Sequence, residues 1–350
     1  MEHPAGIDPE ALRPFFADSV PGYGGGTLSA SRIEGGRSNL TYVVTEGDGG
    51  AAWVLRRPPL GHVLPTAHDM GREFRLLSAL DGTAVPVPHP IAQCTDPDII
   101  GAPFYVMDLV DGLVVRTADD AALLTEAQAA GTSRALVATL TAIHDVDPAA
   151  VGLGDLGRPD GYLERQVRRW GQQWERSATR PLPALDELAA RLRAGVPPSS
   201  GAAIVHGDYR LDNTILDRDD PTRIAAVVDW EMATLGDPLA DLGLLLVYMS
   251  DAAAGVVDVA GAARANPGFL DPDGIAAAYA DASGRDLAAI DFYVVLGYFK
   301  LAVVAEGIAA RHAKGQTVGE GFDRIGASVP VLVDAALEIA SASSLPGLRA

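Results

Sequence analysis

Hydrophobic and polar residues follow two different patterns along the chain. In the first third, short segments rich in β-branched residues alternate between apolar and polar positions, which is typical of half-buried strands. Such segments occupy residues 27–33, 40–46 and 51–55. The sequence GDGG at 47–50 separates the last two and has the glycine pattern of a hairpin turn. We therefore predict an antiparallel, strand-rich beginning to the fold, preceded by a short acidic helix within residues 1–20.

A single helix is predicted inside this strand-rich part. Residues 67–80 change to a helical period, with Met70, Phe74, Leu77 and Leu80 on one face. The prolines of VPVPHP (85–90) exclude a helix there and indicate an extended linker. A further strand, FYVM, follows at 104–107.

The remainder of the chain is predicted to be mostly helical, and the change falls near residues 108–112. Ala- and Leu-rich helical patterns cover 120–147, 160–177, 183–195, 237–251, 273–283, 287–313 and 327–342. Only short strands at 202–206, 213–217 and 224–229 interrupt them. The length of 350 residues is enough for one large or two ordinary domains. The sequence thus predicts an α+β protein.

Composition narrows the classes of function. The formal net charge is −19 and no basic stripe is visible, so we expect no nucleic-acid partner. Cys94 is the only cysteine, which excludes an internal disulfide and a cysteine-based zinc site. Residues 1–16 lack the basic and apolar regions of a signal peptide, so we expect a cytoplasmic protein. Lys300 and Glu306 interrupt the apolar stretch 292–310, which predicts a buried helix and no membrane span.

Two buried-looking strands end in acids. VHGDYRLDNTIL (205–216) places Asp208 after Gly207, where glycine permits a sharp turn, and Asn213 follows five residues later. IAAVVDWEMATLGDP (224–238) leads directly into Asp229. Burying a carboxylate is costly unless it is paired, hydrogen-bonded or bound to a metal. Asn213 and Asp229 suit Mg²⁺, whose remaining ligands can be phosphate oxygens, and Asp208 would then be free to act as a base.

These two motifs resemble a known family. HGDYRLDN is similar to the H-G-D-x-x-x-x-N catalytic loop of the aminoglycoside phosphotransferase and choline kinase-like family, and VVDWEMATLGDPLADLG is similar to its metal-binding segment. The motifs occur in the family's order, and the resemblance extends over roughly residues 25–315. It implies a protein kinase-like fold, with a nucleotide-binding lobe at 1–108 and a helical lobe at 109–350 that carries catalysis and the acceptor site.

The resemblance also implies roles for the acidic residues. Asp208 resembles the family's catalytic base. Asn213 resembles the amide that is the first metal ligand and belongs with Asp208 to the catalytic loop, and Asp229 resembles the main Mg²⁺-binding carboxylate. His206 is expected to hold the catalytic loop by hydrogen bonds, and Asp241 to brace the same loop. His144 is expected to be structural.

The expected phosphate grip is EGGRSN (34–39), between two predicted strands. Gly35 and Gly36 would let backbone N–H groups approach phosphates, while Ser38 and Asn39 add side-chain donors. Taken alone, this stretch favours an ordinary glycine-rich hairpin, because glycine pairs are common in turns, and the two downstream motifs reverse that preference.

The third strand departs from the family pattern, because WVLRRPP contains no lysine. Arg56 stands at the position of the usual ATP-binding lysine, and Glu73 is its expected partner. Arginine keeps the charge and can grip phosphate through two nitrogens. Arg57 is the alternative, because strand alternation lets only one of the two face the cleft. The L-R-R-x-P pattern resembles the branch of the family associated with acyl-CoA dehydrogenases.

The segment expected to join the two lobes, called the hinge (104–112), and the acceptor site are predicted only from their positions in the sequence. Asp108 to Val110 would hydrogen-bond a purine, with Met107 near the base. Four residues on the C-terminal helices could line the acceptor pocket, and they fit ordinary core and surface positions equally well. They are Tyr293, Tyr298, Glu306 and Arg311.

The sequence therefore predicts a small-molecule kinase that uses Mg²⁺–ATP, with GTP as the less favoured phosphoryl donor. The branch resemblance suggests a hydroxyacyl acceptor, and the broader family an aminoglycoside-like or choline-like one. A nucleotide-binding pseudokinase is the alternative motivated by the missing lysine. A second alternative is a metal-dependent hydrolase that uses His206, Asp208 and Asp229.

Overall fold

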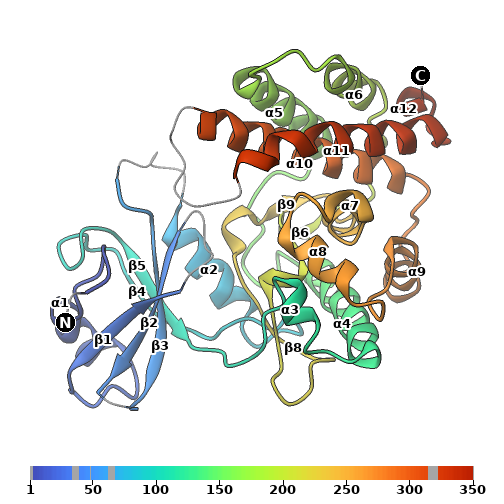
Figure 1. The fold of residues 1–350 in the computed structure, drawn as a ribbon. Coiled ribbons are helices and arrows are strands. Elements are labelled where there is room, and N and C mark those ends of the chain that lie inside the picture. Colours follow the sequence, from blue (N-terminus) through green and yellow to red (C-terminus); the bar gives the residue numbers. More distant parts are fainter. Residues whose placement is uncertain (1–2, 34–38, 48, 62–67, 314–321, 350) are drawn as a thin grey trace. The chain divides into compact units, whose positions relative to one another are not determined.

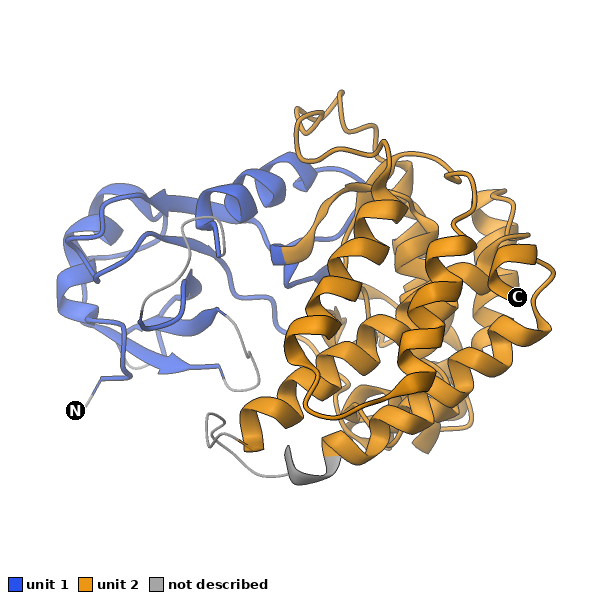
Figure 2. Cartoon of the chain, turned by 90° about the horizontal axis from the view of Figure 1, so that it is seen from above, with its two compact units in different colours: residues 1–111, 225–231 blue, residues 112–224, 232–350 orange. Residues whose placement is uncertain are grey.

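A computed structural model describes residues 3–33, 39–47, 49–61, 68–313 and 322–349. The chain divides into two compact units, coloured separately in Figure 2. Unit 1 contains Met1–Asp111 together with Ala225–Glu231, and unit 2 contains Gly112–Ile224 and Met232–Ala350. The segment that carries Asp229 therefore belongs to unit 1, although it lies far from the rest of that unit in the sequence.

Unit 1 is built around a five-stranded antiparallel sheet with the order β1-β2-β3-β5-β4 (Figure 1). Its strands are β1 (Leu28–Arg32), β2 (Leu40–Glu46), β3 (Ala52–Arg57), β4 (Pro90–Cys94) and β5 (Phe104–Asp108). Its helices are α1 (Pro9–Ser19), which contacts β1, and α2 (Met70–Leu80), which contacts β4 and β5. In β2 the alternating residues Leu40, Tyr42 and Val44 are buried, as the polar–apolar alternation of the sequence predicts.

One strand of this sheet differs from the sequence prediction. The proline-rich stretch was expected to be only a linker, yet β4 begins at Pro90 and pairs with β5. Because β4 lies at the sheet edge, a proline there removes no ladder hydrogen bond from a second neighbour.

Unit 2 is predominantly helical. Its helices are α3 (Ala118–Ala121), α4 (Glu126–Asp145), α5 (Tyr162–Ser177), α6 (Pro183–Ala194), α7 (Leu239–Tyr248), α8 (Asp258–Ala265), α9 (Pro272–Ser283), α10 (Ile290–Ala313), α11 (Phe322–Ala342) and α12 (Pro346–Arg349). The pattern at 120–147 was expected to form one helix, but it forms α3 and α4. The reason is a capping box in which Thr125 and Gln128 satisfy each other's backbone N–H groups and start a new helix. The short helix α8 was not predicted.

Helix α10 forms the centre of unit 2 and contacts α5, α6, α7 and α11. By length and composition alone, α10 and the segment Ile325–Ala342 could each cross a membrane. In α10, 78% of the most apolar stretch is buried inside the protein, which fits the core helix predicted from the sequence. Tyr293 and Glu306 on this helix are part of the interior, where they bond Asp237 and Thr179 respectively.

Short strands connect the helices where the two motifs lie. Strand β6 (Ala203–Val205) pairs antiparallel with β9 (Thr234–Gly236). Strand β7 (Thr214–Leu216) follows the first motif, and β8 (Ile224–Val227) lies where the chain passes from unit 2 into the second segment of unit 1. The motifs therefore sit at the ends of short, buried strands, as the sequence predicts.

Candidate active site

Strand β3 presents two arginines to opposite sides of the sheet. Arg56 Nε lies 3.2 Å from a carboxylate oxygen of Glu73, and Arg56 Nη2 donates to Asp229 Oδ1 at 2.5 Å. Arg57 instead donates to backbone oxygens, including those of Gly6 at 2.5 Å and Ile100 at 2.8 Å. Because successive side chains of a strand point to opposite faces, Arg56 contacts the carboxylates of Glu73 and Asp229, while Arg57 braces the surrounding loops.

The Arg56 cluster holds three charges in a mostly buried place. The side chain of Glu73 is 3% exposed and that of Arg56 is 11% exposed. Burial alone would lower the pKa of Arg56, but Glu73, Tyr105 and Asp229 raise it above its ordinary value. Burial raises the pKa of Glu73, and the charge of Arg56 opposes this. One permanent cation therefore faces two carboxylates in this corner of unit 1, and each carboxylate has Arg56 as an ion-pair partner.

Asp229 has an unusual backbone conformation. Its φ of 65° lies in the left-handed region, where aspartate is better tolerated than most residues other than glycine. The next residue anchors the turn, because the Trp230 indole is 1% exposed and donates to the carbonyl of Val227 at 3.0 Å. The buried indole fixes the turn, while the Asp229 carboxylate stays 31% exposed and able to meet a ligand.

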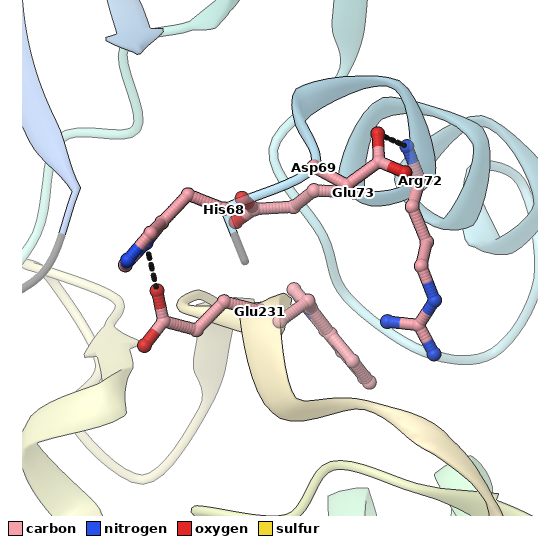
Figure 3. Close-up of a pocket in the computed structure, with 6 residues that line it drawn as sticks. His68, Asp69, Arg72, Glu73 and Glu231 are labelled. Carbon is pink, nitrogen blue, oxygen red and sulfur yellow. Dashed lines mark hydrogen bonds and ion pairs between the residues drawn. The ribbon is translucent and has the colours of Figure 1, made fainter. Parts of the chain in front are cut away.

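Glu231 and Asn39 extend this corner of unit 1. Asn39 is buried and its side-chain nitrogen donates to Glu231 Oε2 at 3.0 Å. A small pocket lies alongside, lined by His68, Asp69, Arg72, Glu73, Trp230 and Glu231 (Figure 3). His68 Nδ1 approaches Glu231 Oε2 to 3.8 Å, which is an ion-pair distance too long for a hydrogen bond. Asp69 caps α2 by accepting from the backbone N–H of Arg72.

The predicted hinge lies at the end of β5. Asp108 is exposed, and its backbone N–H already donates to the carbonyl of His89 at 2.9 Å. A purine at this position could therefore use the carbonyl of Asp108 or the backbone of Val110, but not the Asp108 N–H. Val110 follows the strand and is partly exposed.

The loop that carries Asp208 is fixed from below by one acid of unit 2. Asp241 on α7 is 1% exposed and accepts from the backbone N–H groups of His206 and Gly207 at 2.6 and 2.8 Å. His144 approaches the same carboxylate at 3.5 Å and contacts the Tyr279 hydroxyl at 2.7 Å. These contacts confirm the bracing role predicted for Asp241 and the structural role predicted for His144.

Gly207 makes the turn possible. Its φ is +83°, and a Cβ placed there would come within 2.9 Å of the carbonyl oxygen of Met232. Both the left-handed backbone and the close approach require glycine. The turn aims the next residue, Asp208, away from the strand.

Asp208 is held by groups that favour its ionised form. Tyr248 donates its hydroxyl to Oδ1 at 2.9 Å, and Arg210 Nε lies 3.2 Å from Oδ2. Burial alone would raise the pKa of Asp208, but Arg210 and Lys300 lead the groups that hold it below its ordinary value. The side chain remains 21% exposed, so it can act as an ionised hydrogen-bond acceptor toward a ligand.

Asn213 lies in a 3₁₀ turn, Leu211–Asn213, after this loop. It is 6% exposed, and its side-chain nitrogen donates to the Asp208 carbonyl at 2.9 Å and to Asp208 Oδ2 at 3.3 Å. The amide nitrogen is thereby committed to the loop, which leaves the amide oxygen as the atom suited to a metal. Asn213 and Asp208 thus form one hydrogen-bonded pair in unit 2.

The structure groups the predicted residues in two sets. Arg56, Glu73, Asp229 and Asn39 come together in unit 1. In unit 2, Asp208 and Asn213 form the second set. Gly35, Gly36 and Ser38 lie outside the described residues. Within the described part of the chain, no group of three or more His, Cys, Asp or Glu side chains is arranged to hold a metal alone. The carboxylate oxygens of Asp229 in unit 1 and the amide oxygen of Asn213 in unit 2 are each of the oxygen type that Mg²⁺ prefers.

Three residues at Asp208 were not recognised from the sequence as functional. Arg210 lies inside the first motif, and its spacing of two from Asp208 was the available signal. Lys300 was noted only as an interruption of an apolar helix, although a charge in a core helix usually has a specific partner. Tyr248 ends α7 with no distinguishing pattern, so only the tertiary structure identifies it.

A β-sheet unit with a buried cation–carboxylate pair and a helical unit with a braced H-G-D loop are the features predicted from the sequence for a small-molecule kinase with a protein kinase-like fold. Residues 29–293 match the sequence model of the phosphotransferase enzyme family. The chain belongs to this family. This confirms the predicted fold and the predicted class of enzyme, a phosphotransferase with an alcohol group as acceptor.

Individual relatives support the same assignment. Acyl-CoA dehydrogenase family member 11 of Gallus gallus is 33% identical over 98% of this chain and 45% of its own length. The chain thus spans less than half of that relative. A candidate aminoglycoside phosphotransferase from Ralstonia eutropha is 32% identical, with a TM-score of 0.79 over 95% of this chain and 98% of the other. Choline kinase from Cryptosporidium parvum shares the fold, with 11% identity and a TM-score of 0.65 over 95% of both chains.

Proposed function

We propose that the protein transfers the γ-phosphoryl group of Mg²⁺–ATP to a hydroxyl group of a small molecule. The observation that carries the proposal is the state of Asp208, an ionised and partly exposed carboxylate oriented by Tyr248, Arg210 and Asn213. A carboxylate in this state can accept the proton of an attacking hydroxyl. ATP is the nucleotide in the solved complex of one structural neighbour, the aminoglycoside phosphotransferase APH(2″)-IIa.

Each residue of the two sets has a part in this reaction. Asp208 orients the acceptor hydroxyl and receives its proton as the phosphoryl group moves. Asp229 and the amide oxygen of Asn213 would hold Mg²⁺, which neutralises charge on the phosphates when it is bound. Arg56 would support the phosphates, with Glu73 fixing the direction of its guanidinium. Most of the rate would come from positioning and charge stabilisation.

Nucleotide binding would require a rearrangement around Arg56. Its guanidinium donates to Asp229, so a metal at Asp229 competes with that hydrogen bond. Arg56 can then turn toward the phosphates while its Nε stays with Glu73. The backbone of Asp108 to Val110 would bind the base, and Asn39, with Gly35, Gly36 and Ser38, would contact the phosphates.

The branch of the acyl-CoA dehydrogenase relatives favours a hydroxyacyl compound as the acceptor. Aminoglycoside-like and choline-like alcohols are the other classes that the family suggests. A protein of this kind would work on a diffusible small molecule, in the cytoplasm, without a nucleic acid or a membrane as partner.

The test is ADP release from Mg²⁺–ATP against a panel of hydroxyacyl-CoAs, aminoglycosides, choline and sugars. Asp208→Asn removes the proton acceptor, and we expect the rate to fall by roughly 100-fold or more. Asp219→Asn, an equal change on an exposed turn of the same unit, is the matched control and should leave the rate unchanged. Bound ATP without release of ADP for any acceptor would favour a pseudokinase, and acceptor-dependent release that survives Asp208→Asn would refute the role of Asp208.

A further inference from the structure

Two cations near the Asp208 loop can do more than the function proposed above requires: Lys300, which that function uses only for its charge on Asp208, and Arg169, which acts electrostatically on Lys300. Lys300 projects from α10, and its Nζ donates to the carbonyl of Gly207 at 2.6 Å, immediately before Asp208 in the chain. The same Nζ lies 5.6 Å from the centroid of the Trp170 ring. Arg169 Cζ lies 5.8 Å from the centroid of that ring. Arg169, Trp170 and Lys300 together form a group that we call the Trp170 cluster.

The cations of the cluster form no short ion pair with a described residue, although Asp208 and Asp241 act electrostatically on Lys300 at longer range. Neither Arg169 nor Lys300 has a carboxylate oxygen within 4.0 Å among the residues that the structure describes. Arg210, by contrast, is engaged by Asp208 and Asp212. Acidic residues outnumber basic ones 46 to 27 in this chain, so two neighbouring cations without an ion-pair partner in its described segments are unexpected from its composition. Placing two cations near one ring costs repulsion, which a bound anion would relieve.

Accessibility also fits a binding site. Arg169 is exposed, and Trp170 and Lys300 are partly exposed. A lysine ammonium has three donor hydrogens, and one of them is used on Gly207. The two others have no acceptor in the described part of the chain. An anion bound there would lie next to the residue that precedes the catalytic carboxylate.

We propose that Arg169 and Lys300 bind an anionic group of the hydroxyl acceptor, and so select acceptors that carry a phosphate or carboxylate. The assignment rests on the proposed function, in which Asp208 receives the acceptor's proton. A net charge of −19 repels anionic molecules at long range, so a local pair of cations is what lets one dock. The Trp170 ring holds both cations in place through cation–π contacts and offers an apolar surface to the rest of the acceptor.

The anion site can be tested without any acceptor, by tryptophan fluorescence. Trp170 is the partly exposed one of the four tryptophans, because Trp53, Trp174 and Trp230 are 4%, 5% and 1% exposed. Because Arg169 and Lys300 lie against the Trp170 ring, quenching by the anion iodide should exceed quenching by the cation caesium. Because Trp170 is the accessible tryptophan, Trp170→Phe should abolish most of the quenching by either ion. High salt should remove the preference for iodide, because exposed charges are screened.

Variants identify the residues that attract the anion. Arg169→Gln is expected to lower the iodide quenching constant by roughly 5-fold, since one unit charge a few ångströms away in water is worth about 1 kcal/mol. Arg176→Gln is the matched control, because Arg176 lies on the same helix and bonds the carbonyl of Gln172. Lys300→Met should act like Arg169→Gln, and Lys300→Arg should retain the quenching. Equal quenching by iodide and caesium in the wild type, or equal effects of Arg169→Gln and Arg176→Gln, would overturn the proposal.

The link to the acceptor is tested with two thioesters of one hydroxyacyl group. A hydroxyacyl-CoA carries phosphates, while the N-acetylcysteamine thioester of the same acid is neutral. Arg169→Gln should lower kcat/KM for the CoA thioester by about 10-fold, as expected for a lost charged hydrogen bond, and leave the neutral one unchanged. A wild type that turns over both thioesters equally well would refute the selection of anionic acceptors. Intact iodide quenching with no phosphotransfer at all would refute the proposed function and leave the anion site standing.

Discussion

Replacing Asp241 by asparagine is expected to destabilise unit 2 by about 3 kcal/mol. The substitution keeps the volume of the side chain and removes only its charge and one acceptor oxygen. In the wild type, each carboxylate oxygen accepts one backbone N–H, from His206 and from Gly207. The variant can accept only one of these, and its amide NH₂ then faces a second donor.

The magnitude follows from the burial of these groups. Asp241 is 1% exposed, so water cannot replace the lost acceptor. A buried backbone N–H left without a partner costs about 1–3 kcal/mol, and the loss of charge weakens the remaining hydrogen bond by roughly 1 kcal/mol. A change of this size should lower the melting temperature by roughly 6–12 °C for a unit of this length.

Urea and thermal denaturation followed by circular dichroism would measure the change. Asp273→Asn is the matched control, because Asp273 is an exposed residue in the first turn of α9. It should change stability by less than about 0.5 kcal/mol. If Asp241→Asn destabilises the protein no more than this control, the carboxylate does not brace the loop and the reasoning fails.

The same comparison has a pH dependence with a definite sign. Burial alone would raise the pKa of Asp241, but the hydrogen bond with His144 leads the interactions that hold it below 3.8. A carboxyl whose pKa is lowered in the folded state stabilises that state above its unfolded pKa, and loses this contribution as the pH falls through the folded pKa. The difference between wild type and variant should therefore be constant near neutral pH and shrink below about pH 4.

Two further predictions concern the charged groups at the site. Arg56→Met leaves Glu73 buried without its cation and should destabilise unit 1 by about 3 kcal/mol in denaturant titrations, whereas Arg56→Lys should recover most of the loss; equal stability of the two variants would contradict the pairing. Tyr248→Phe removes the hydroxyl that donates to Asp208 Oδ1, so the rate at pH 7 should fall by roughly 10-fold. Because that hydrogen bond helps to lower the pKa of Asp208, the acid limb of the pH–rate profile should move to higher pH, and an unshifted limb would exclude this role.

The sequence by itself determined the main elements and the two motifs of this protein. Period-two and helical patterns predicted the strands of unit 1 and most helices of unit 2, because burial on one face leaves a regular apolar spacing. Gly207 before Asp208 predicted the turn, since its conformation is a property of the residue itself. Local chemistry was enough for these features. It was insufficient for β4, where the pairing with β5 outweighs the proline at its start.

Only the tertiary structure decided which side chains meet. Alternation along β3 did not decide whether Arg56 or Arg57 pairs with Glu73. The structure decides it, because Arg56 bonds Glu73 and Arg57 bonds the carbonyl of Gly6. Tyr248 and Lys300 reach the Asp208 loop from 40 and 93 residues away in sequence, measured from Asp208 and from Gly207 respectively. No local pattern records such a contact, because it depends on how α7 and α10 pack against the loop. The sequence thus determined which groups are available for the chemistry, and packing of distant helices decided which of them surround the catalytic carboxylate.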